Sequence, residues 1–263
     1  MVATVERLRP DLLELAAKAV GEDPFARVGE GTRFDQPALY CAALAGLERA
    51  GRPRADLYAG HSLGEITALA AAGAMSEEDG LRLVAERGRL MEATAAQTGG
   101  AMLAVRAGWE EAAAIAERHG LALANDNSPE QVVLSGPLDG IEAAEAEAGD
   151  AGTRVKRLPI PGAFHSPLMA DAVEPFLSFL EGIELTEPRA PVFSCVTAAP
   201  FDDVRKRLAE ALVEPVRWVE VLQALHAAGG RRFQETGPGR VLSGLVRRTL
   251  ENVEIVAKED ADG

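Results

Sequence analysis

Ser62 lies in a hexapeptide whose residue types are typical of an activated nucleophile. Residues 60–65 read Gly-His-Ser-Leu-Gly-Glu and match G-x-S-x-G, the pattern of a nucleophile elbow, in which a strand turns sharply into a helix and presents a serine. Residues 56–59 favour a short strand, and residues 63–72 favour a helix that ends at Gly73. Glycines suit such a turn because it leaves little room for a Cβ atom. The pattern alone fits equally well a strand–helix turn with an incidental serine.

A serine hydroxyl needs a general base, and histidine is best matched to neutral pH. Three of the four histidines have unfavourable contexts. His61 adjoins the serine in a tight turn, His119 lies at a predicted helix end, and His226 lies inside a predicted helix. His165 instead lies in a loop, residues 161–167, just before a predicted helix. Elimination favours His165 as the base. The alternative is a structural histidine at a helix start.

Arg87 occupies an unusual place in a long predicted helix. The sequence Ser-Glu-Glu-Asp at residues 76–79 has the form of a capping box and predicts that this helix begins there. Arg87 falls on its apolar stripe, four residues after Leu83 and four before Met91. A buried arginine is unfavourable unless it pairs with an anion. Either its head reaches water or an internal acidic partner, or it binds the carboxylate of a substrate.

Composition restricts the possible functions. The 263 residues carry a formal net charge of −14, which argues against a general nucleic-acid binder and against an anionic membrane surface. The two cysteines, Cys41 and Cys195, have no metal-ligand spacing, and we expect no metal and no cofactor. No apolar run approaches the roughly 20 residues of a membrane span, and the N-terminus lacks the apolar centre of a signal peptide. We therefore expect a cytoplasmic location.

The order of predicted elements favours an α/β fold with a mainly parallel sheet covered on both faces. A helix is predicted over residues 2–20, and a polar, mobile tail from Lys258. Within residues 99–161 the predicted order is β-α-β-β-α-β, that of a ferredoxin-like unit, with a turn-rich link over residues 126–130 between its middle strands. The sequence thus predicts a core of residues 1–98 and 162–263 and a small inserted domain of residues 99–161.

Six motifs in order resemble the malonyl-CoA:acyl-carrier-protein transacylase family, the acyltransferases of fatty acid and polyketide synthesis. They are Gly-His-Ser-Leu-Gly-Glu at 60–65, Glu-Arg-Gly at 86–88, Asn-Asp-Asn-Ser-Pro at 125–129, Gly-Ala-Phe-His-Ser-Pro-Leu-Met at 162–169, Pro-Val-Arg-Trp at 215–218 and Glu-Thr-Gly-Pro-Gly at 235–239. The resemblance covers nearly the whole chain. It implies an α/β-hydrolase-like parallel-sheet core with an inserted ferredoxin-like subdomain.

The resemblance also implies roles for the site residues. Ser62 would attack the thioester of malonyl-CoA and carry the malonyl group as an ester. His165 would act as general base and then as acid, oriented by backbone carbonyls, one of them from Ala211. Arg87 would hold the malonyl carboxylate by a bidentate pair. The amide of Leu63 would stabilise the oxyanion.

Four further residues receive weaker assignments from the resemblance. Phe164 before the histidine resembles the pattern of malonyl-selective members. Met91 would line the acyl pocket, although plain core filling explains it as well. Asn125 and Asn127 fall where the family faces coenzyme A and the carrier, and turn chemistry explains them almost as well.

Two alternatives stay open, and one departure from the family pattern motivates the first. Family members usually open with a strand and a Gly-Gln-Gly-Ser-Gln-like loop that supplies a second oxyanion amide, whereas Met1 aligns inside the helix that follows. A shortened, impaired homologue that only binds the carrier is therefore one alternative. A serine esterase that uses the same elbow is the other; it would need a carboxylate partner for the histidine and gives no reason for Arg87.

The partner implied by the resemblance is an acyl carrier protein with a phosphopantetheine thiol. Such carriers are acidic, so an enzyme with a net charge of −14 needs a local basic patch to attract one. The candidates form a cluster near the C-terminus: Arg231, Arg232, Arg240, Arg247 and Arg248. A solvated helix face is the alternative for each of them.

Overall fold

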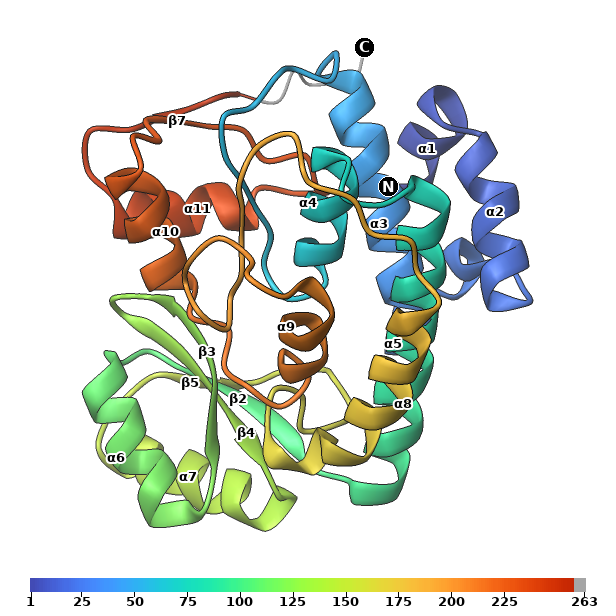
Figure 1. Ribbon diagram of the computed structural model, residues 1–263. Helices are drawn as coiled ribbons and strands as arrows, with labels where there is room; N and C mark the ends of the chain where they lie inside the picture. Colours follow the sequence, from blue (N-terminus) through green and yellow to red (C-terminus); the bar gives the residue numbers. More distant parts are fainter. Residues whose placement is uncertain (258–263) are drawn as a thin grey trace.

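The computed structural model describes residues 1–257, and the tail from Lys258, predicted to be mobile, lies outside the described residues. Figure 1 shows longer helices gathered in one part of the molecule, and the sheet beside them has four strands. Helices and strands alternate along most of the chain. The α/β class predicted from the sequence is confirmed.

The α-helices are α1 (Val2–Leu8), α2 (Asp11–Val20), α3 (Thr32–Arg49), α4 (Gly64–Ala72), α5 (Glu77–Thr98), α6 (Trp109–His119), α7 (Leu138–Asp150), α8 (Ala170–Glu181), α9 (Val204–Glu210), α10 (Trp218–Ala227) and α11 (Val241–Thr249). Two 3-10 helices are η1 (Pro24–Arg27) and η2 (Pro167–Met169). The strands are β1 (Tyr58–Ala59), β2 (Ala101–Val105), β3 (Ala122–Ser128), β4 (Gln131–Gly136), β5 (Val155–Arg157), β6 (Val192–Phe193), β7 (Arg232–Phe233) and β8 (Glu254–Ile255).

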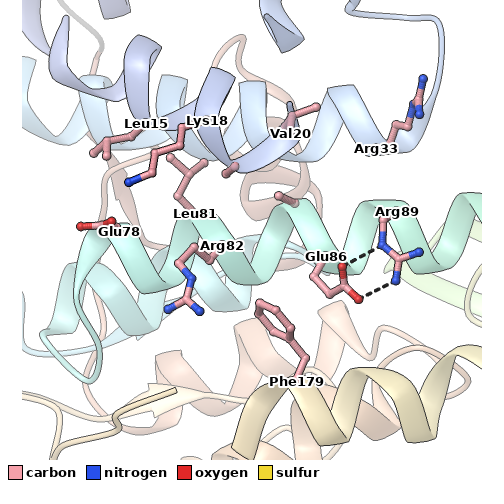
Figure 2. A pocket seen from close by; sticks show the side chains of 12 residues that line it. Leu15, Lys18, Val20, Arg33, Glu78, Leu81, Arg82, Glu86, Arg89 and Phe179 are labelled. Carbon is pink, nitrogen blue, oxygen red and sulfur yellow. Dashed lines mark hydrogen bonds and ion pairs between the residues drawn. The ribbon is translucent and has the colours of Figure 1, made fainter. Parts of the chain in front are cut away.

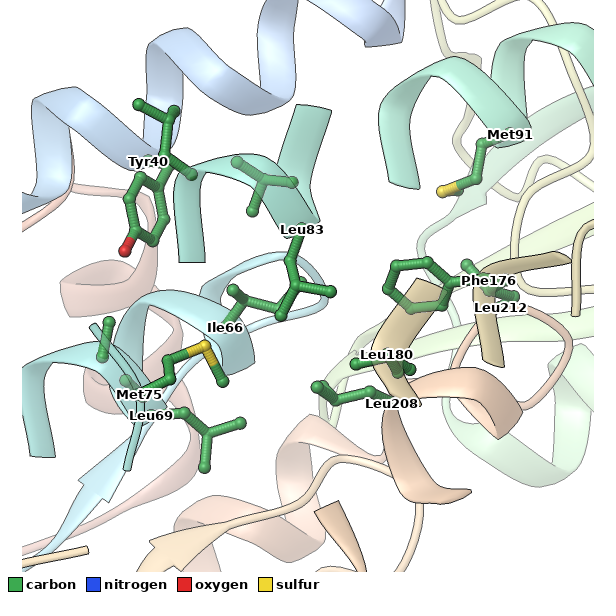
Figure 3. Close-up of a cluster of buried hydrophobic side chains, with 14 of the residues drawn as sticks. Tyr40, Ile66, Leu69, Met75, Leu83, Met91, Phe176, Leu180, Leu208 and Leu212 are labelled. Carbon is green, nitrogen blue, oxygen red and sulfur yellow. The ribbon is translucent and has the colours of Figure 1, made fainter. Parts of the chain in front are cut away.

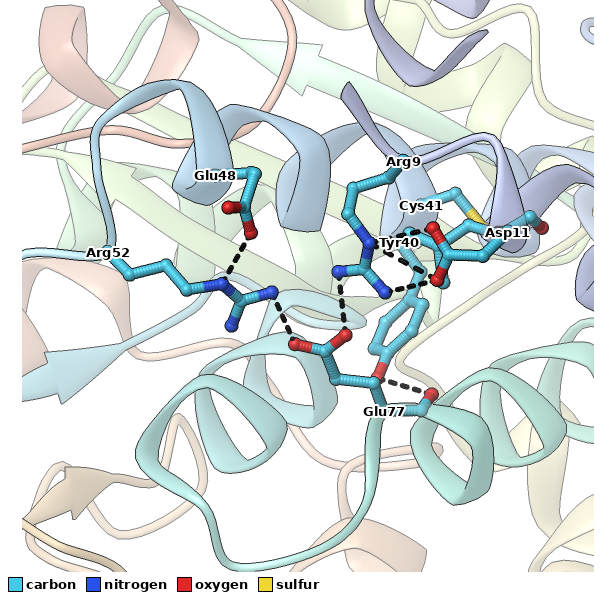
Figure 4. A network of polar contacts seen from close by, with 8 residues as sticks. Arg9, Asp11, Tyr40, Cys41, Glu48, Arg52 and Glu77 are labelled. Atoms are coloured by element: carbon cyan, nitrogen blue, oxygen red, sulfur yellow. Dashed lines mark hydrogen bonds and ion pairs between the residues drawn. The ribbon is translucent and has the colours of Figure 1, made fainter. Parts of the chain in front are cut away.

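Two helices, α1 and α2, replace the single helix predicted over residues 2–20. That prediction was wrong because Pro10 lies between them, and a proline lacks the N–H that a continuing helix needs. The side chain of Arg9 then lies between two carboxylates, 2.6 Å from Asp11 and 2.7 Å from Glu77 (Figure 4). The Arg9–Glu77 pair fastens the N-terminal helices to the first turn of α5.

The apolar core of the larger part lies between α3, α4, α5, α8 and α9. Figure 3 shows side chains from all five helices meeting there, among them Tyr40, Ile66, Leu83, Phe176 and Leu208. Each is at most 2% exposed, and full burial of an apolar side chain of this size contributes about 1.5–3 kcal/mol. The predicted start of α5 is confirmed, because Ser76 is its N-cap residue and the Ser76 hydroxyl accepts a hydrogen bond from the amide of Asp79 at 3.0 Å.

Parallel pairing is present but brief. β1 pairs with β6 and β7 pairs with β8, each pair in parallel and two residues long. The strand predicted over residues 192–196 ends at Phe193, because Ser194 donates its amide to Ala199 in a turn and Ala198 has a positive φ of 53°. The predicted parallel pairing of the core strands is therefore confirmed, and it consists of two short strand pairs.

The β-α-β-β-α-β order predicted for residues 99–161 is also confirmed. The sheet order is β3-β4-β2-β5, and every neighbouring pair is antiparallel. The turn-rich link predicted over residues 126–130 is wrong, because β3 continues to Ser128 by pairing with β4 and only Pro129 and Glu130 form the turn. The division of the chain into two domains stays a prediction.

Within the described part of the chain, no helix is long and apolar enough to cross a membrane. The longest helix, α5, carries a charged residue in nearly every turn.

Gly46 lets α3 pass close to a loop near the C-terminus. A Cβ atom at Gly46 would lie 1.9 Å from the carbonyl oxygen of Thr236, so Gly46→Ala should lower the free energy of unfolding by about 1–3 kcal/mol through overpacking. Gly149→Ala is the matched control, since a Cβ there meets nothing within 4 Å on the exposed end of α7, and it should stabilise by up to about 1 kcal/mol. Urea denaturation measures both, and equal effects would contradict the packing argument.

Candidate active site

Ser62 lies at a sharp turn between β1 and α4, as the elbow pattern predicts. Its backbone has a φ of 54°, in the left-handed region that non-glycine residues rarely adopt. A Cβ atom at Gly60 would lie 1.9 Å from the carbonyl oxygen of Gly64, so the turn closes only with glycine at position 60. The strained backbone is held by the strand before it and the helix after it, which favours a functional serine over an incidental one.

The structure brings His165 to Ser62 from the loop between β5 and η2. Ser62 Oγ lies 2.8 Å from His165 Nε2, and His165 Nδ1 lies 3.2 Å from the carbonyl oxygen of Glu214. A carbonyl only accepts, so Nδ1 carries the proton and Nε2 is left to accept from the serine hydroxyl. A backbone carbonyl orients the histidine, as predicted, but the hydrogen bond goes to Glu214 and not to the predicted Ala211. The backbone of Ala211 contributes only a small rise in the pKa of His165.

His165 is held in its neutral form. Its side chain is 4% exposed, and burial, with smaller contributions from the positive charge of Arg87 and from His61, lowers the pKa of His165 to about 3. A neutral imidazole at pH 7 is the form that can accept a proton. The alternative reading, a structural histidine at a helix start, does not account for its contact with Ser62.

Arg87 points into the same site from α5. Its side chain is 3% exposed; one guanidinium nitrogen donates to Gln36 Oε1 at 2.9 Å and the other to Ser62 Oγ at 3.1 Å. Burial lowers the pKa of Arg87 to about 10, and Glu65 opposes that shift, so the guanidinium keeps its charge at pH 7. Among residues 1–257, no carboxylate lies within ion-pair distance of it. The guanidinium of Arg87 is therefore buried with no carboxylate in direct contact, although the buried Glu65 acts on it electrostatically.

Glu65 is a buried carboxylate that the sequence reasoning left without a role. It is 1% exposed and accepts the backbone amide of Cys195 at 2.6 Å, and burial raises its pKa to about 7. The thiol of Cys195 in turn donates to the carbonyl oxygen of Gly60 at 3.2 Å. These contacts fasten the segment after β6 to the underside of the elbow. The signal was present, because Glu65 is the last residue of the hexapeptide.

His61, beside the nucleophile, points away from it. Its Nε2 lies 2.8 Å from Oδ1 of Asn127 on β3, and its ring meets Trp218 edge-on at a centroid distance of 5.5 Å. Burial lowers the pKa of His61. The expectation that His61 does not serve as base agrees with this geometry. Asn127 contacts His61, the residue that precedes Ser62.

Three of the four remaining predicted site residues adjoin this centre, directly or through Gln36. Leu63 follows the nucleophile and caps the N-terminus of α4. Met91 is 2% exposed and its sulfur accepts from Gln36 at 3.4 Å, and Phe164, next to His165, is 7% exposed. Asn125 is 6% exposed and pairs through its backbone with Val216. Their proposed contacts with oxyanion, acyl group or coenzyme A stay predictions.

A groove of about 450 Å³ lies elsewhere, between α2, α5 and α8 (Figure 2). It is lined by the charged stripe of α5, where Arg82 pairs with Asp79 and Arg89 pairs with Glu86. Arg82 and Arg89 lie on the side of the helix opposite Arg87. Since Arg82 and Arg89 are already paired within the helix, we place no chemistry in this groove.

Comparison with known proteins gives consistent results. Residues 25–261 match the acyl transferase domain family. The chain is 43% identical over 263 residues to "Polyketide biosynthesis protein ThaF" of Burkholderia thailandensis, covering 92% of this chain and 22% of that much longer protein. It is 38% identical over 248 residues to "Polyketide biosynthesis malonyl CoA-acyl carrier protein transacylase PksC" of Bacillus subtilis, covering 90% of this chain and 85% of the relative.

Two solved structures share the fold closely. The malonyl CoA-acyl carrier protein transacylase of Coxiella burnetii has a TM-score of 0.89 at 31% identity, over 97% of this chain and 88% of that one. A malonyl-transacylase solved in complex with a type II polyketide acyl-carrier protein has a TM-score of 0.90 at 30% identity, over 99% of this chain and 92% of that one.

The depressed pKa of His165 predicts how the reactivity of Ser62 depends on pH. A fluorophosphonate probe should phosphonylate Ser62 at a rate that changes less than about twofold between pH 8 and pH 5.5, since His165 stays neutral throughout. A histidine with an ordinary pKa of about 6.5 would make the rate fall about tenfold over that range. The measurement is labelling time courses by intact-protein mass spectrometry, with Ser62→Ala as the unlabelled control. A tenfold fall would show that His165 titrates normally.

Proposed function

Because this chain belongs to the acyl transferase family that includes the malonyl CoA-acyl carrier protein transacylases, we propose that it moves a malonyl group from malonyl-CoA to the phosphopantetheine thiol of an acyl carrier protein. The group would travel as an ester on Ser62. The reaction would serve fatty acid or polyketide synthesis, as in the relatives named above. The expected cytoplasmic location stays a prediction.

One observation carries this proposal beyond general acyl transfer. Arg87 is a charged, buried guanidinium that touches the nucleophile and, among the described residues, has no carboxylate in direct contact. A buried charge without a counterion is strongly unfavourable by itself. An acyl group that ends in a carboxylate would supply the missing anion and could form two parallel hydrogen bonds with the guanidinium. A malonyl group has such a carboxylate, and an acetyl group does not.

In the first half-reaction, His165 Nε2 would take the hydroxyl proton of Ser62 as Oγ attacks the thioester carbon. The carbonyl oxygen becomes an oxyanion, which the amide of Leu63, the N-cap residue of α4, would stabilise. The intermediate collapses with cleavage of the C–S bond. The proton on Nε2 passes to the departing thiolate, so coenzyme A leaves as a thiol and Ser62 holds the malonyl ester.

The second half-reaction would reverse these roles with a different thiol. His165 takes the proton of the phosphopantetheine thiol, and the sulfur attacks the ester carbon. The C–O bond to Ser62 breaks, and the serine oxygen recovers its proton from Nε2. The bound carboxylate would help in both halves, because it offsets the positive charge of Arg87 that disfavours a protonated His165.

The esterase alternative receives no support from the geometry. It would need a carboxylate to orient the histidine, whereas Nδ1 of His165 meets a backbone carbonyl. A basic docking patch for the carrier stays a prediction. Of its candidates, Arg232 pairs with Glu254 at 3.3 Å, while Arg247 and Arg248 lie exposed in the last turn of α11.

The nucleophile can be tested directly. Incubation with malonyl-CoA should give a malonyl adduct on the wild-type protein, detected by intact-protein mass spectrometry and mapped to Ser62. Ser62→Ala should give none, because no ester can form. An adduct of unchanged yield in that variant would refute the assignment.

Acyl selectivity tests Arg87. Arg87→Ala should lower kcat/KM for malonyl-CoA by about 100-fold or more, because the carboxylate loses a buried charged partner. Activity with acetyl-CoA should be kept or rise. The measurement is steady-state transfer of each acyl group to an acyl carrier protein, and circular dichroism confirms folding. Unchanged preference for malonyl-CoA would remove Arg87 from the acyl site.

A further inference from the structure

Besides Ser62, the guanidinium of Arg87 contacts a residue that lies outside the six sequence motifs. Gln36 is 3% exposed on α3, and its Oε1 accepts a hydrogen bond from Arg87 at 2.9 Å. We infer that Gln36 is a specificity-determining residue, which aims Arg87 at the acyl site and leaves its charge free for the substrate. This inference rests on the proposed function, because it concerns the carboxylate that Arg87 would bind.

The contact exists because α3 and α5 approach closely at this point. A Cβ atom at Gly88 would lie 2.7 Å from the carbonyl oxygen of Thr32, so only glycine lets the first turn of α3 lie against α5. Gln36 is one turn further along α3, and Arg87 precedes Gly88. The Glu-Arg-Gly motif therefore brings together an arginine and the glycine that admits its partner.

The orientation of the Gln36 amide follows from its other bonds. Its Nε2 donates to Thr32 Oγ1 at 3.0 Å and lies 3.4 Å from the sulfur of Met91, which can only accept. The nitrogen is thus assigned to these two acceptors, and the oxygen must face the guanidinium. One end of Arg87 is thereby fixed on α3, and its other end points at Ser62, 3.1 Å from Oγ.

The partner is an amide, and this matters electrostatically. A carbonyl oxygen orients the guanidinium without cancelling its charge, whereas a carboxylate in the same place would form an internal ion pair. In the free protein the N–H directed at the acyl site bonds to the hydroxyl of Ser62. A substrate carboxylate would replace that weak neutral acceptor with a charged one. An acyl group without a carboxylate would leave the charge unmatched and the nucleophile still bonded to Arg87.

Two substitutions separate this role from core filling. Q36E has nearly the same shape but places a carboxylate against Arg87, where it competes with the substrate. It should lower kcat/KM for malonyl-CoA by about tenfold or more, mainly through KM, and change acetyl-CoA transfer less than about threefold. Its Tm should not fall, since a buried charge gains a partner. Q36M, which keeps the volume but removes the acceptor, should also lower the ratio of malonyl to acetyl transfer and should lower Tm.

The matched control is Q223E, the same substitution at an exposed position of α10, which should leave both the ratio and Tm unchanged. A ratio equal to that of the wild type in Q36E would overturn the inference. Should Q36E fail to fold, an unchanged ratio in Q36M would overturn it instead. If the wild-type protein forms no malonyl adduct, the proposed function fails and not the role of Gln36 alone.

Discussion

The charge of Arg87, buried with no carboxylate in direct contact, is the constraint on which the site depends. Gln36 fixes the guanidinium, Ser62 lies at its free end, and the opposing charge of Glu65 acts without direct contact. The same charge contributes to the low pKa of His165, which keeps the imidazole in its basic form. An anion that enters the site therefore acts twice, since it pairs with the arginine and eases protonation of the histidine.

The catalytic residues lie in loops, and different helices and strands hold these loops in place. Ser62 lies between β1 and α4, and His165 lies in the loop before η2; both have positive φ. Glu65 fastens the segment after β6 beneath the elbow, and the carbonyl of Glu214 fixes the imidazole. Strained backbone of this kind persists only when its surroundings determine it from several sides. The short parallel strands suffice because they only need to fix where the elbow begins.

The sequence identified the residues whose types are unusual at their positions. It missed a residue whose role depends on a contact between two helices. Ser62 and Arg87 stood out because a serine between glycines and an arginine on an apolar stripe break local rules. Gln36 gave no such signal, because glutamine is an ordinary helix residue and its contact depends on how closely two helices approach. Element boundaries failed for related reasons. The break at Pro10 could have been predicted from local chemistry, whereas the extension of β3 to Ser128 depends on pairing with β4.

The hydrogen bond between His61 and Asn127 joins the elbow to β3, and so spans two parts of the chain 66 residues apart. Recombination of related sequences at the ends of the four-stranded sheet would transfer Asn127 without His61. A chimaera made there could fold correctly in both parts and still lack a matched pair beside its nucleophile. Compatibility between parents is thus decided by the pair at positions 61 and 127 as well as by the residues that perform the chemistry.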